Sequence, residues 1–148
     1  MEKIEKLKEI INNSNNIVAF TGAGVSTLSG IKDFRGKNGL YKEKFEHSAE
    51  YYLSSRCFFL EPDTFYKFYK SNMNVLDKEP NIVHKYLTKL EKDGKLKAVV
   101  TQNIDGLDKK SGTKNVLEIH GTIYKNYCAK CGKEYSAEFV FNSEGVPY

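Results

Sequence analysis

The stretch TGAGVSTLSGIKDFRG, residues 21–36, stands out from the rest of the chain. It follows a short apolar run, IVAF, so Gly22 and Gly24 lie where a phosphate-binding turn after a first strand would place them. The third glycine of G-x-G-x-x-G is missing, since Thr27 occupies its position. Glycine turns after strands are more often simple tight turns, so this loop alone is weak evidence for a bound phosphate.

Length and composition fit one globular domain. The chain has 148 residues, of which 28% are charged and 40% apolar. The net charge of +4 comes from 23 Lys and Arg against 19 Asp and Glu, too weak and scattered to favour nucleic acid. No apolar run approaches the ~20 residues of a membrane span, and the start MEKIEKLKEI predicts a charged helix and no signal peptide. Three cysteines, an odd number, favour a reducing compartment, so we expect the protein in the cytoplasm.

Apolar periodicity predicts alternating helices and strands. The expected helices are residues 2–12, which are amphipathic, and 82–92, which Gly94 ends. The expected strands are residues 17–20, which we predict to be buried, 96–101 and 116–119. The aromatic-rich segment 41–73 has weak helical periodicity, broken at Pro62. The order strand, helices, strand predicts an α/β fold of the βαβ type.

Two polar stretches follow the first two expected strands. Asp33, Phe34 and Arg35 combine a carboxylate, an aromatic face and a fixed cation, which suit a nucleotide with a flat, charged ring. The plainer interpretation is a surface ion pair for Arg35 and a core position for Phe34. TQNIDG, residues 101–106, ends the second strand at the edge where parallel sheets bind ligands. Its amides suit sugar hydroxyls and Asp105 suits a carboxamide, while an Asx-rich turn is the alternative.

Histidine offers the best candidate for a general base. His120 follows the short strand 116–119, and imidazole titrates near neutral pH. A lone histidine is more often structural, and we interpret His47 and His84 in that way. Cys57 is most simply a small buried apolar residue.

The remaining cysteines form the pattern CAKCG, residues 128–132. Cys128 and Cys131 are typical of half a zinc knuckle, in which two thiolates lie on one turn. A closed structural site needs four ligands, and the sequence offers no second pair. A redox Cys-x-x-Cys is the alternative, but that motif usually opens a helix after the first strand of a thioredoxin-like unit.

Taken together, these motifs resemble those of the sirtuins, the NAD-dependent protein deacylases. GAGVST, GIKDFRG, TQNIDGLD, EIHG and CAKC occur in the family's order over essentially the whole chain, a far more specific set than any glycine motif alone. Two residues depart from the pattern: Lys32 stands where the family mostly has proline, and Asp108 where it commonly has histidine. The resemblance implies an α/β fold, the front part of a Rossmann-like parallel sheet with a helical insertion and an incomplete zinc-ribbon module.

The same resemblance implies that residues 1–148 are a truncated sirtuin catalytic domain. Its segments would be a Rossmann-like NAD-binding part at 14–40 and 95–121, an aromatic-rich helical insertion at 41–80, and an incomplete zinc-binding module at 122–148. In sirtuins a stretch like residues 144–148 leads directly into a second Cys-x-x-Cys. We therefore expect the rest of the zinc site and of the sheet to lie beyond Tyr148.

The activity implied by the resemblance is NAD-dependent protein lysine deacetylation, in which the acetyl group of acetyl-lysine passes to ADP-ribose and nicotinamide is released. Acetylated protein lysines would be the substrates, NAD the cofactor, and zinc a structural metal bound by Cys128 and Cys131. His120 would be the catalytic base, taking a proton from a ribose hydroxyl. The implied cofactor-binding residues are Gly22, Ala23, Gly24, Ser26, Thr27, Asp33, Phe34, Arg35, Gln102, Asn103, Ile104, Asp105 and His120.

Acyl preference follows from one further motif. Sirtuins that prefer succinyl or malonyl lysine have Tyr-x-x-Arg where this chain has Tyr66 and Tyr69, so we expect an uncharged acyl group such as acetyl. Lys67 and Lys70 are the alternative cations. Two other classes of function compete: a non-catalytic NAD or ADP-ribose binding remnant, and a small zinc-dependent interaction module completed by another subunit.

Overall fold

The computed structural model describes residues 2–36 and 39–147. The expected segments 14–40 and 122–148 include Lys37, Asn38 and Tyr148, which lie outside the described residues. The helices are α1 (Glu2–Asn13), α2 (Ala49–Tyr52), α3 (Ser55–Leu60), α4 (Pro62–Met73), α5 (Ile82–Lys92), α6 (Leu107–Lys110) and α7 (Ala137–Asn142), with short 3₁₀ helices at Ala23–Ser29 and Leu40–Lys42. The strands are β1 (Ile17–Thr21), β2 (Leu96–Thr101), β3 (Val116–Glu118), β4 (Asn126–Tyr127) and β5 (Glu134–Tyr135).

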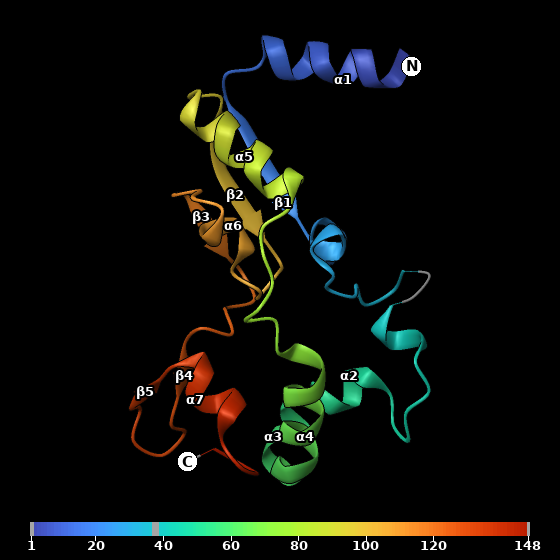
Figure 1. Ribbon diagram of the computed structural model, residues 1–148, viewed down its shortest axis with the longest axis vertical. Coiled ribbons are helices and arrows are strands. Elements are labelled where there is room, and N and C mark those ends of the chain that lie inside the picture. The colour runs from blue at the N-terminus through green and yellow to red at the C-terminus, as the bar shows by residue number, and fades with distance from the viewer. Residues whose placement is uncertain (1, 37–38, 148) are drawn as a thin grey trace.

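The chain forms two lobes (Figure 1). The sheet lobe contains β1, β2, β3, α5 and α6, with α1 lying across its far end. The helical lobe contains α2, α3, α4 and α7 together with the small antiparallel hairpin of β4 and β5. Between β1 and β2 the chain passes through most of the helical lobe, so the two lobes are interleaved in sequence.

The sheet lobe confirms the predicted α/β fold with a parallel sheet. The strand order is β1-β2-β3, and both pairings are parallel. Helix α5 packs on β2, where Leu90, Leu96 and Val99 form a buried core. Since parallel strands end at the same edge, the loops after β1 and β2 leave the sheet side by side.

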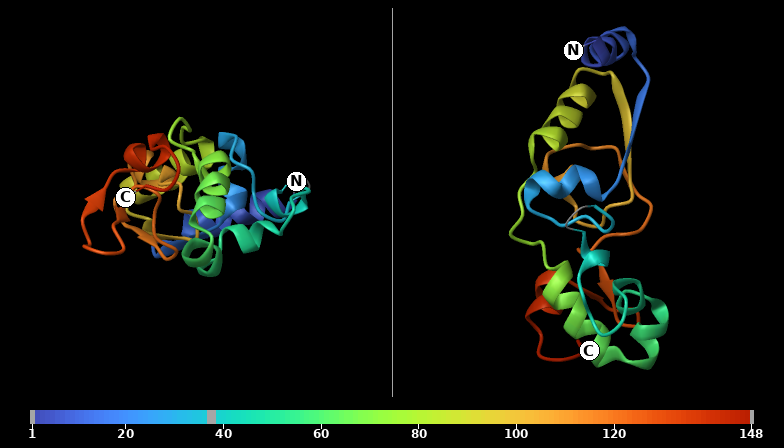
Figure 2. Two further views of the ribbon diagram at one scale, coloured as in Figure 1. Left: turned by 90° about the horizontal axis from the view of Figure 1, so that it is seen from below. Right: turned by 90° about the vertical axis from the view of Figure 1, so that its right-hand side faces the viewer.

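The prediction that the first strand is buried is wrong. Val18 and Phe20 of β1 are 59% and 66% exposed, and Leu117 of β3 is 51% exposed. Helix α5 covers one side of the sheet, while no helix of residues 2–36 and 39–147 covers the opposite side, as the right-hand view of Figure 2 shows. An apolar strand signals that both faces suit burial, but only packing against a second layer buries them.

Helix α1 confirms the predicted amphipathic helix but buries none of its residues. Its apolar residues Ile4, Leu7 and Ile10 are each more than half exposed. The end of the helix is fixed by Lys95, whose Nζ donates to the backbone oxygens of Ile11 (3.1 Å) and Asn12 (2.6 Å). A basic group at these carbonyls also interacts favourably with the helix dipole.

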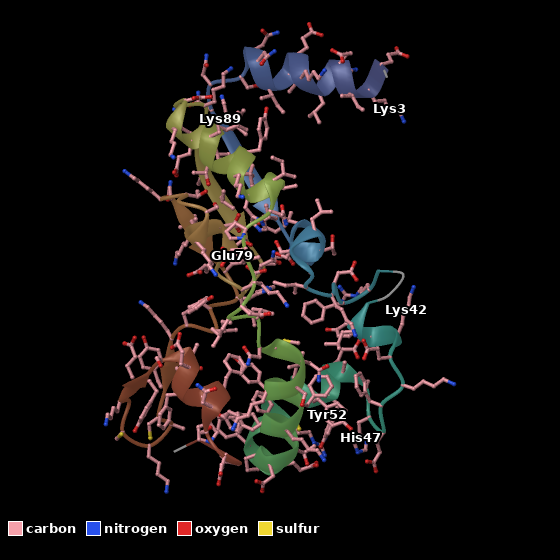
Figure 3. All side chains as sticks on the ribbon, in the orientation of Figure 1. Lys3, Lys42, His47, Tyr52, Glu79 and Lys89 are labelled. Atoms are coloured by element: carbon pink, nitrogen blue, oxygen red, sulfur yellow. The ribbon has the colours of Figure 1, made fainter. Side chains whose placement is uncertain are left out.

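Aromatic packing holds the helical lobe together. The predicted break at Pro62 is confirmed, because α3 ends at Leu60 and Pro62 opens α4, where its missing N–H costs nothing. Tyr52 stacks on Phe68 with ring centroids 4.6 Å apart, and His47 packs beside Tyr52, as Figure 3 shows. Cys57 is fully buried, as predicted. None of the helices within residues 2–36 and 39–147 has the length and apolar character to cross a membrane.

Candidate functional site

The glycine loop begins directly after β1. Gly22 has extended backbone and precedes the 3₁₀ helix Ala23–Ser29. Gly30 closes the turn at φ 79°, a left-handed conformation that glycine adopts without strain, and its N–H donates to the oxygen of Thr27 (3.0 Å). The loop thereby directs Ser26 toward the interior, where it is fully buried.

The second loop, residues 102–106, follows β2 at the same edge of the sheet. Asp105 fixes its shape, because the backbone N–H of Leu107 donates to Asp105 Oδ1 (2.9 Å). Gly106 has φ 69°, and a Cβ there would lie 2.6 Å from the ring of Tyr124. Only glycine satisfies both conditions, so the turn that exposes the TQNID side chains depends on Gly106.

These two loops meet through buried hydrogen bonds. The hydroxyl of Ser26 donates to Asp105 Oδ2 at 2.6 Å, a distance typical of a bond to a charged acceptor. Asn103 Nδ2 donates to Ser26 Oγ (3.2 Å) and to the backbone oxygen of Gly22 (3.1 Å). All three side chains are at least nine-tenths buried. The structure thus joins residues that the sequence separates by 79 positions.

His120 approaches the same loops from the end of β3. The backbone N–H of Ile119 donates to the oxygen of Thr101 (3.1 Å), which extends the sheet pairing up to the histidine. His120 Nδ1 lies 3.0 Å from the backbone oxygen of Gln102. A carbonyl oxygen only accepts, so Nδ1 carries the proton and Nε2 retains a basic lone pair. This is the tautomer that a general base requires.

The Asp-Phe-Arg stretch forms a compact turn. Asp33 Oδ1 accepts from the backbone N–H of Gly36 (3.0 Å). Phe34 packs against Tyr41 with ring centroids 5.2 Å apart. The guanidinium of Arg35 lies 5.5 Å above the Tyr41 ring, so a cation–π contact occupies it here, in place of the simple surface ion pair considered above.

A cavity of about 410 Å³ opens where the two loops face the end of α4. Eight of the predicted residues line it: Ala23, Ser26, Phe34, Gln102, Asn103, Ile104, Asp105 and His120. The other predicted residues do not line it: Gly22, Gly24, Thr27, Asp33 and Arg35. Those five belong to the same loops, and their expected contacts with cofactor stay predictions.

Sequence reasoning missed the apolar wall of this cavity. The wall contains Ile31, Leu40, Met73, Val75 and Ile123, and polar lining residues come from Ser71, Asn72 and Asn74 at the end of α4. The only signal was position: Ile31 lies between two predicted motifs, and Ile123 follows His120 closely. No signal in the sequence marked residues 71–75. These residues reach the cavity only because α4 ends beside the two loops.

Size and chemistry of the cavity suit a flat ring attached to a sugar. Its volume falls within the range of ~300–1,000 Å³ of small-molecule sites. Apolar side chains provide the walls for a ring, while the buried carboxylate of Asp105 retains lone pairs for an amide donor. The amides of Gln102 and Asn103 offer partners for sugar hydroxyls. The residues present therefore fit the nicotinamide end of NAD.

The predicted zinc ligands lie on the hairpin between β4 and β5. The backbone N–H of Gly132 donates to the oxygen of Cys128 (2.9 Å), which closes the turn. Hydrogen bonds from the backbone of Cys131 and Lys130 lower the pKa of the Cys128 thiol and so favour the thiolate. The described residues contain no group of three or more His, Cys, Asp or Glu side chains able to hold a metal. Two sulfur donors fit half of a tetrahedral zinc site and do not complete one.

The residues tied to acyl preference do not line the cavity. Burial raises the pKa of Tyr69 to about 12, and its ring stacks on Phe141 at 5.3 Å. Lys70 Nζ donates to the backbone oxygens of Ser143 and Gly145, both at 2.6 Å. Lys70 therefore fixes the chain after α7, and it is engaged there instead of facing an acyl group.

A comparison with protein families matches residues 22–146 to the Sir2 family. This chain belongs to the Sir2 family. Its motifs, the parallel sheet and the paired loops thus agree with one another, and the resemblance stated from the sequence is confirmed.

Relatives and solved structures extend the Sir2 match. An NAD-dependent protein deacetylase of Clostridium perfringens is 52% identical, over 99% of this chain and 61% of that protein. An NAD-dependent protein deacetylase of Clostridium acetobutylicum is 50% identical, over 97% of this chain and 60% of that protein. The chain thus spans about three fifths of the length of these curated relatives.

Two solved Sir2 structures have the same fold over most of the chain. One, with a deacetylated peptide and 3′-O-acetyl ADP-ribose, has a TM-score of 0.84 and 40% identity, covering 91% of this chain and 54% of that one. Another, with a peptide and NAD⁺, has a TM-score of 0.78 and 38% identity, and the match covers 91% of this chain and 52% of that one.

Proposed function

We propose that this Sir2 chain supplies the NAD-binding and catalytic loops of a protein lysine deacetylase. The enzyme transfers the acetyl group of acetyl-lysine to ADP-ribose and releases nicotinamide. One observation carries the proposal: the buried Ser26–Asp105 contact and the free Nε2 of His120 border one cavity of suitable size. The deacetylase names of the relatives and the ligands of the solved structures support the same activity.

Each loop has a distinct part in this proposal. Phe34, Ile104 and Asp105 bind the nicotinamide ring, with the carboxylate accepting from its carboxamide. Gln102 and Asn103 bind the attached ribose. Ala23, Thr27 and the glycines of the first loop contact the pyrophosphate and ribose, and Arg35 leaves Tyr41 to lie against the phosphates. When bound, NAD would supply the sugar carbon from which nicotinamide leaves and the ribose hydroxyl that takes up the acetyl group.

His120 acts as the general base. Its Nδ1–H is held by the Gln102 backbone oxygen, so Nε2 accepts the proton of a ribose hydroxyl without a change of tautomer. Because the ring is exposed on the ligand-free protein, it reaches its partner only when substrate and cofactor surround it. A positioned general base contributes ~10²–10⁴-fold to the rate.

The experiment uses this chain and a chimera in which it is joined to the part of the Clostridium perfringens relative that it does not match. Mass spectrometry follows NAD-dependent loss of acetyl from an acetyl-lysine peptide, with a succinyl-lysine peptide as the comparison. We expect the chimera to prefer acetyl-lysine. His120→Ala should reduce its turnover by roughly 10²–10⁴-fold while NAD affinity changes by no more than a few-fold, since the imidazole moves a proton and binds little.

Asp105→Asn provides the contrasting variant. It removes the charged acceptor for the carboxamide, so NAD binding and nicotinamide inhibition should both weaken. If folded His120→Ala chimera keeps its rate per molecule, His120 is not the base. NAD binding by both proteins without turnover by the chimera favours the alternative, a non-catalytic NAD-binding protein.

A further inference from the structure

Three buried side-chain atoms find no hydrogen-bond partner within the described residues: Thr21 Oγ1, His84 Nε2 and Asp108 Oδ1. Buried polar groups in folded proteins are almost always paired, so each such atom needs an explanation. His84 is fully buried and Asp108 is 2% exposed. Neither residue lines the cavity described above.

The first turn of α5 determines the protonation of His84. Its Nδ1 accepts from the backbone N–H of Asn81 (3.2 Å) as one half of a capping box. A nitrogen that accepts carries no proton, so the neutral ring has its proton on Nε2. The unpaired atom of His84 is therefore a buried donor.

Asp108 offers the matching acceptor from α6. The pKa of its carboxyl is raised, chiefly by burial and further by the negative charges of Asp105 and Glu118. His84 and a hydrogen bond with Thr101 act in the opposite direction and lower this pKa. These groups come from α5, β2, β3 and the loop before α6. Among them only His84 has an unpaired donor, and Asp108 Oδ1 is the unpaired acceptor.

The hydroxyl of Ser111 contacts the backbone of both residues. Ser111 Oγ lies 2.7 Å from the backbone oxygen of Asp108 and 3.4 Å from that of His84. Helices α5 and α6 also pack against each other. His84 also lowers the pKa of the Asp108 carboxyl, so the two side chains are near enough to interact electrostatically.

Both residues connect to the loops that form the cavity. On one side, His84 accepts a hydrogen bond from the backbone N–H of Asn81. The side-chain Nδ2 of Asn81 in turn donates to the oxygen of Val25 (2.8 Å) in the glycine loop. On the other side Asp108 follows Leu107, whose N–H holds the Asp105 carboxylate. A link between His84 and Asp108 therefore joins both loops from beneath.

We propose that His84 Nε2–H donates a hydrogen bond to Asp108 Oδ1 and that this buried pair positions the Ser26–Asp105 contact. The two are positioning residues, because they act on the cavity through Asn81 and Asp105. The pair rests on the geometry of this chain, and only its effect on ligand binding rests on the proposed function.

Nuclear magnetic resonance of the ligand-free chain tests the pair directly. The protein has three histidines, and exposed His47 provides a reference whose ring protons are open to water. We expect His84 as the Nε2–H tautomer with a slowly exchanging ring proton. In Asp108→Asn the amide oxygen still accepts, so the proton stays protected, but its resonance moves upfield because the acceptor loses its charge. An Nδ1–H tautomer in the wild type, or a resonance that Asp108→Asn leaves unmoved, overturns the pair.

Positioning is tested with Asp108→Ala and a matched control. Leu90→Ala truncates a buried residue of α5, the helix that carries His84, and leaves both members of the pair in place, so it lowers stability alone. The ¹³C resonance of the Asp105 carboxyl should move in Asp108→Ala and stay in Leu90→Ala. ADP-ribose affinity of the folded chain should fall roughly tenfold in Asp108→Ala, as expected for about one hydrogen bond, and about twofold or less in the other two variants.

The outcomes separate the two proposals. If the wild type binds no ADP-ribose, the proposed function fails while the resonances still decide the pair. If Leu90→Ala shifts the Asp105 resonance as much as Asp108→Ala does, the positioning role fails. Should Asp108→Ala not fold, the comparison of wild type with Asp108→Asn still decides.

Discussion

At the scale of single residues, two carboxyl groups of the sheet lobe respond to pH in opposite directions. Burial raises the pKa of Asp108. Glu91 accepts from the backbone N–H groups of Lys114 and Asn115, each at 2.8 Å, and these bonds lower its pKa. A carboxyl whose pKa is raised on folding stabilises the protein below its unfolded-state pKa, and this contribution is lost as pH rises through the folded-state pKa. A carboxyl whose pKa is lowered on folding stabilises the protein above its unfolded-state pKa, and this contribution is lost as pH falls through the folded-state pKa.

We therefore expect Asp108→Asn to become more stable relative to the wild type as pH rises from about 4, the unfolded value, toward neutral. Glu91→Gln should be less stable than the wild type at neutral pH, and this deficit should shrink as pH falls below about 4. Urea unfolding at several pH values from below 4 up to neutral measures both differences. A stability difference between wild type and Asp108→Asn that does not vary with pH would contradict the Asp108 prediction.

The resemblance to the sirtuins named the polar residues that border the cavity, and their binding roles stay predictions. The Ser26 and Asp105 loops were expected at one sheet edge because each follows a parallel strand, and the structure brings them together. The apolar half was not predictable in the same way. Met73 and Val75 reach the cavity only because α4 ends beside the loops, and residue type alone distinguishes a cavity wall from a core position poorly.

At the scale of elements, the start of α5 combines a helix cap with a tie to the glycine loop. Asn81 Oδ1 accepts from Val83 N–H (2.9 Å), and its Nδ2 donates to Val25 and Ser29. Asn81→Asp keeps the acceptor and loses the donor, while Asn81→Ala loses both. We expect Asn81→Ala to cost about 1–2 kcal/mol more than Asn81→Asp, from the cap alone. Chemical unfolding checks the order, and equal losses would mean that the cap contributes nothing.

The hairpin of β4 and β5 carries the metal prediction. Two thiolates leave two coordination positions to water, so the chain should hold zinc weakly, and Cys128→Ser should weaken it further. Competition with a chromogenic chelator measures the affinity. Stoichiometric zinc that resists the chelator in a monomer would disagree, and half a zinc per chain in a dimer would favour the interaction module completed by another subunit.

The positions of α1, α5 and the three strands of the parallel sheet were predictable, because apolar periodicity is a local signal, as is the break at Pro62. The short elements α6, α7, β4 and β5 were not predicted, because so few residues carry no periodicity. Burial of β1 was not, because it depends on what packs against the sheet. IVAF has the composition of a covered strand, yet Val18 and Phe20 face outward.

At the scale of the whole molecule, one face of the sheet is left uncovered by the part of the chain that the structure describes. Val18, Phe20, Leu117 and Ile119 are all more than half exposed, and the apolar side of α1 is exposed as well. Exposed apolar surface of this extent favours association, so we expect the chain to self-associate and to bind a hydrophobic dye. Phe20→Ser should reduce both without loss of the α5 core, since Phe20 is 66% exposed and is not among the residues of that core. A monomer by light scattering that binds no dye, with strong hydrogen-exchange protection across β2, would contradict this prediction.

The pairing of β1 with β2 also sets an order of events during synthesis. Phe20 finds its partner only in Val100, eighty positions later, and every segment of the helical lobe up to α4 is made in between. At a translation rate of about 5–20 residues per second, β1 waits roughly 4–16 s before its first sheet partner exists. An apolar strand left without a partner for that long is a natural substrate for a chaperone that works on nascent chains. Slow codons between the two strands would prolong this wait, and faster ones would shorten it.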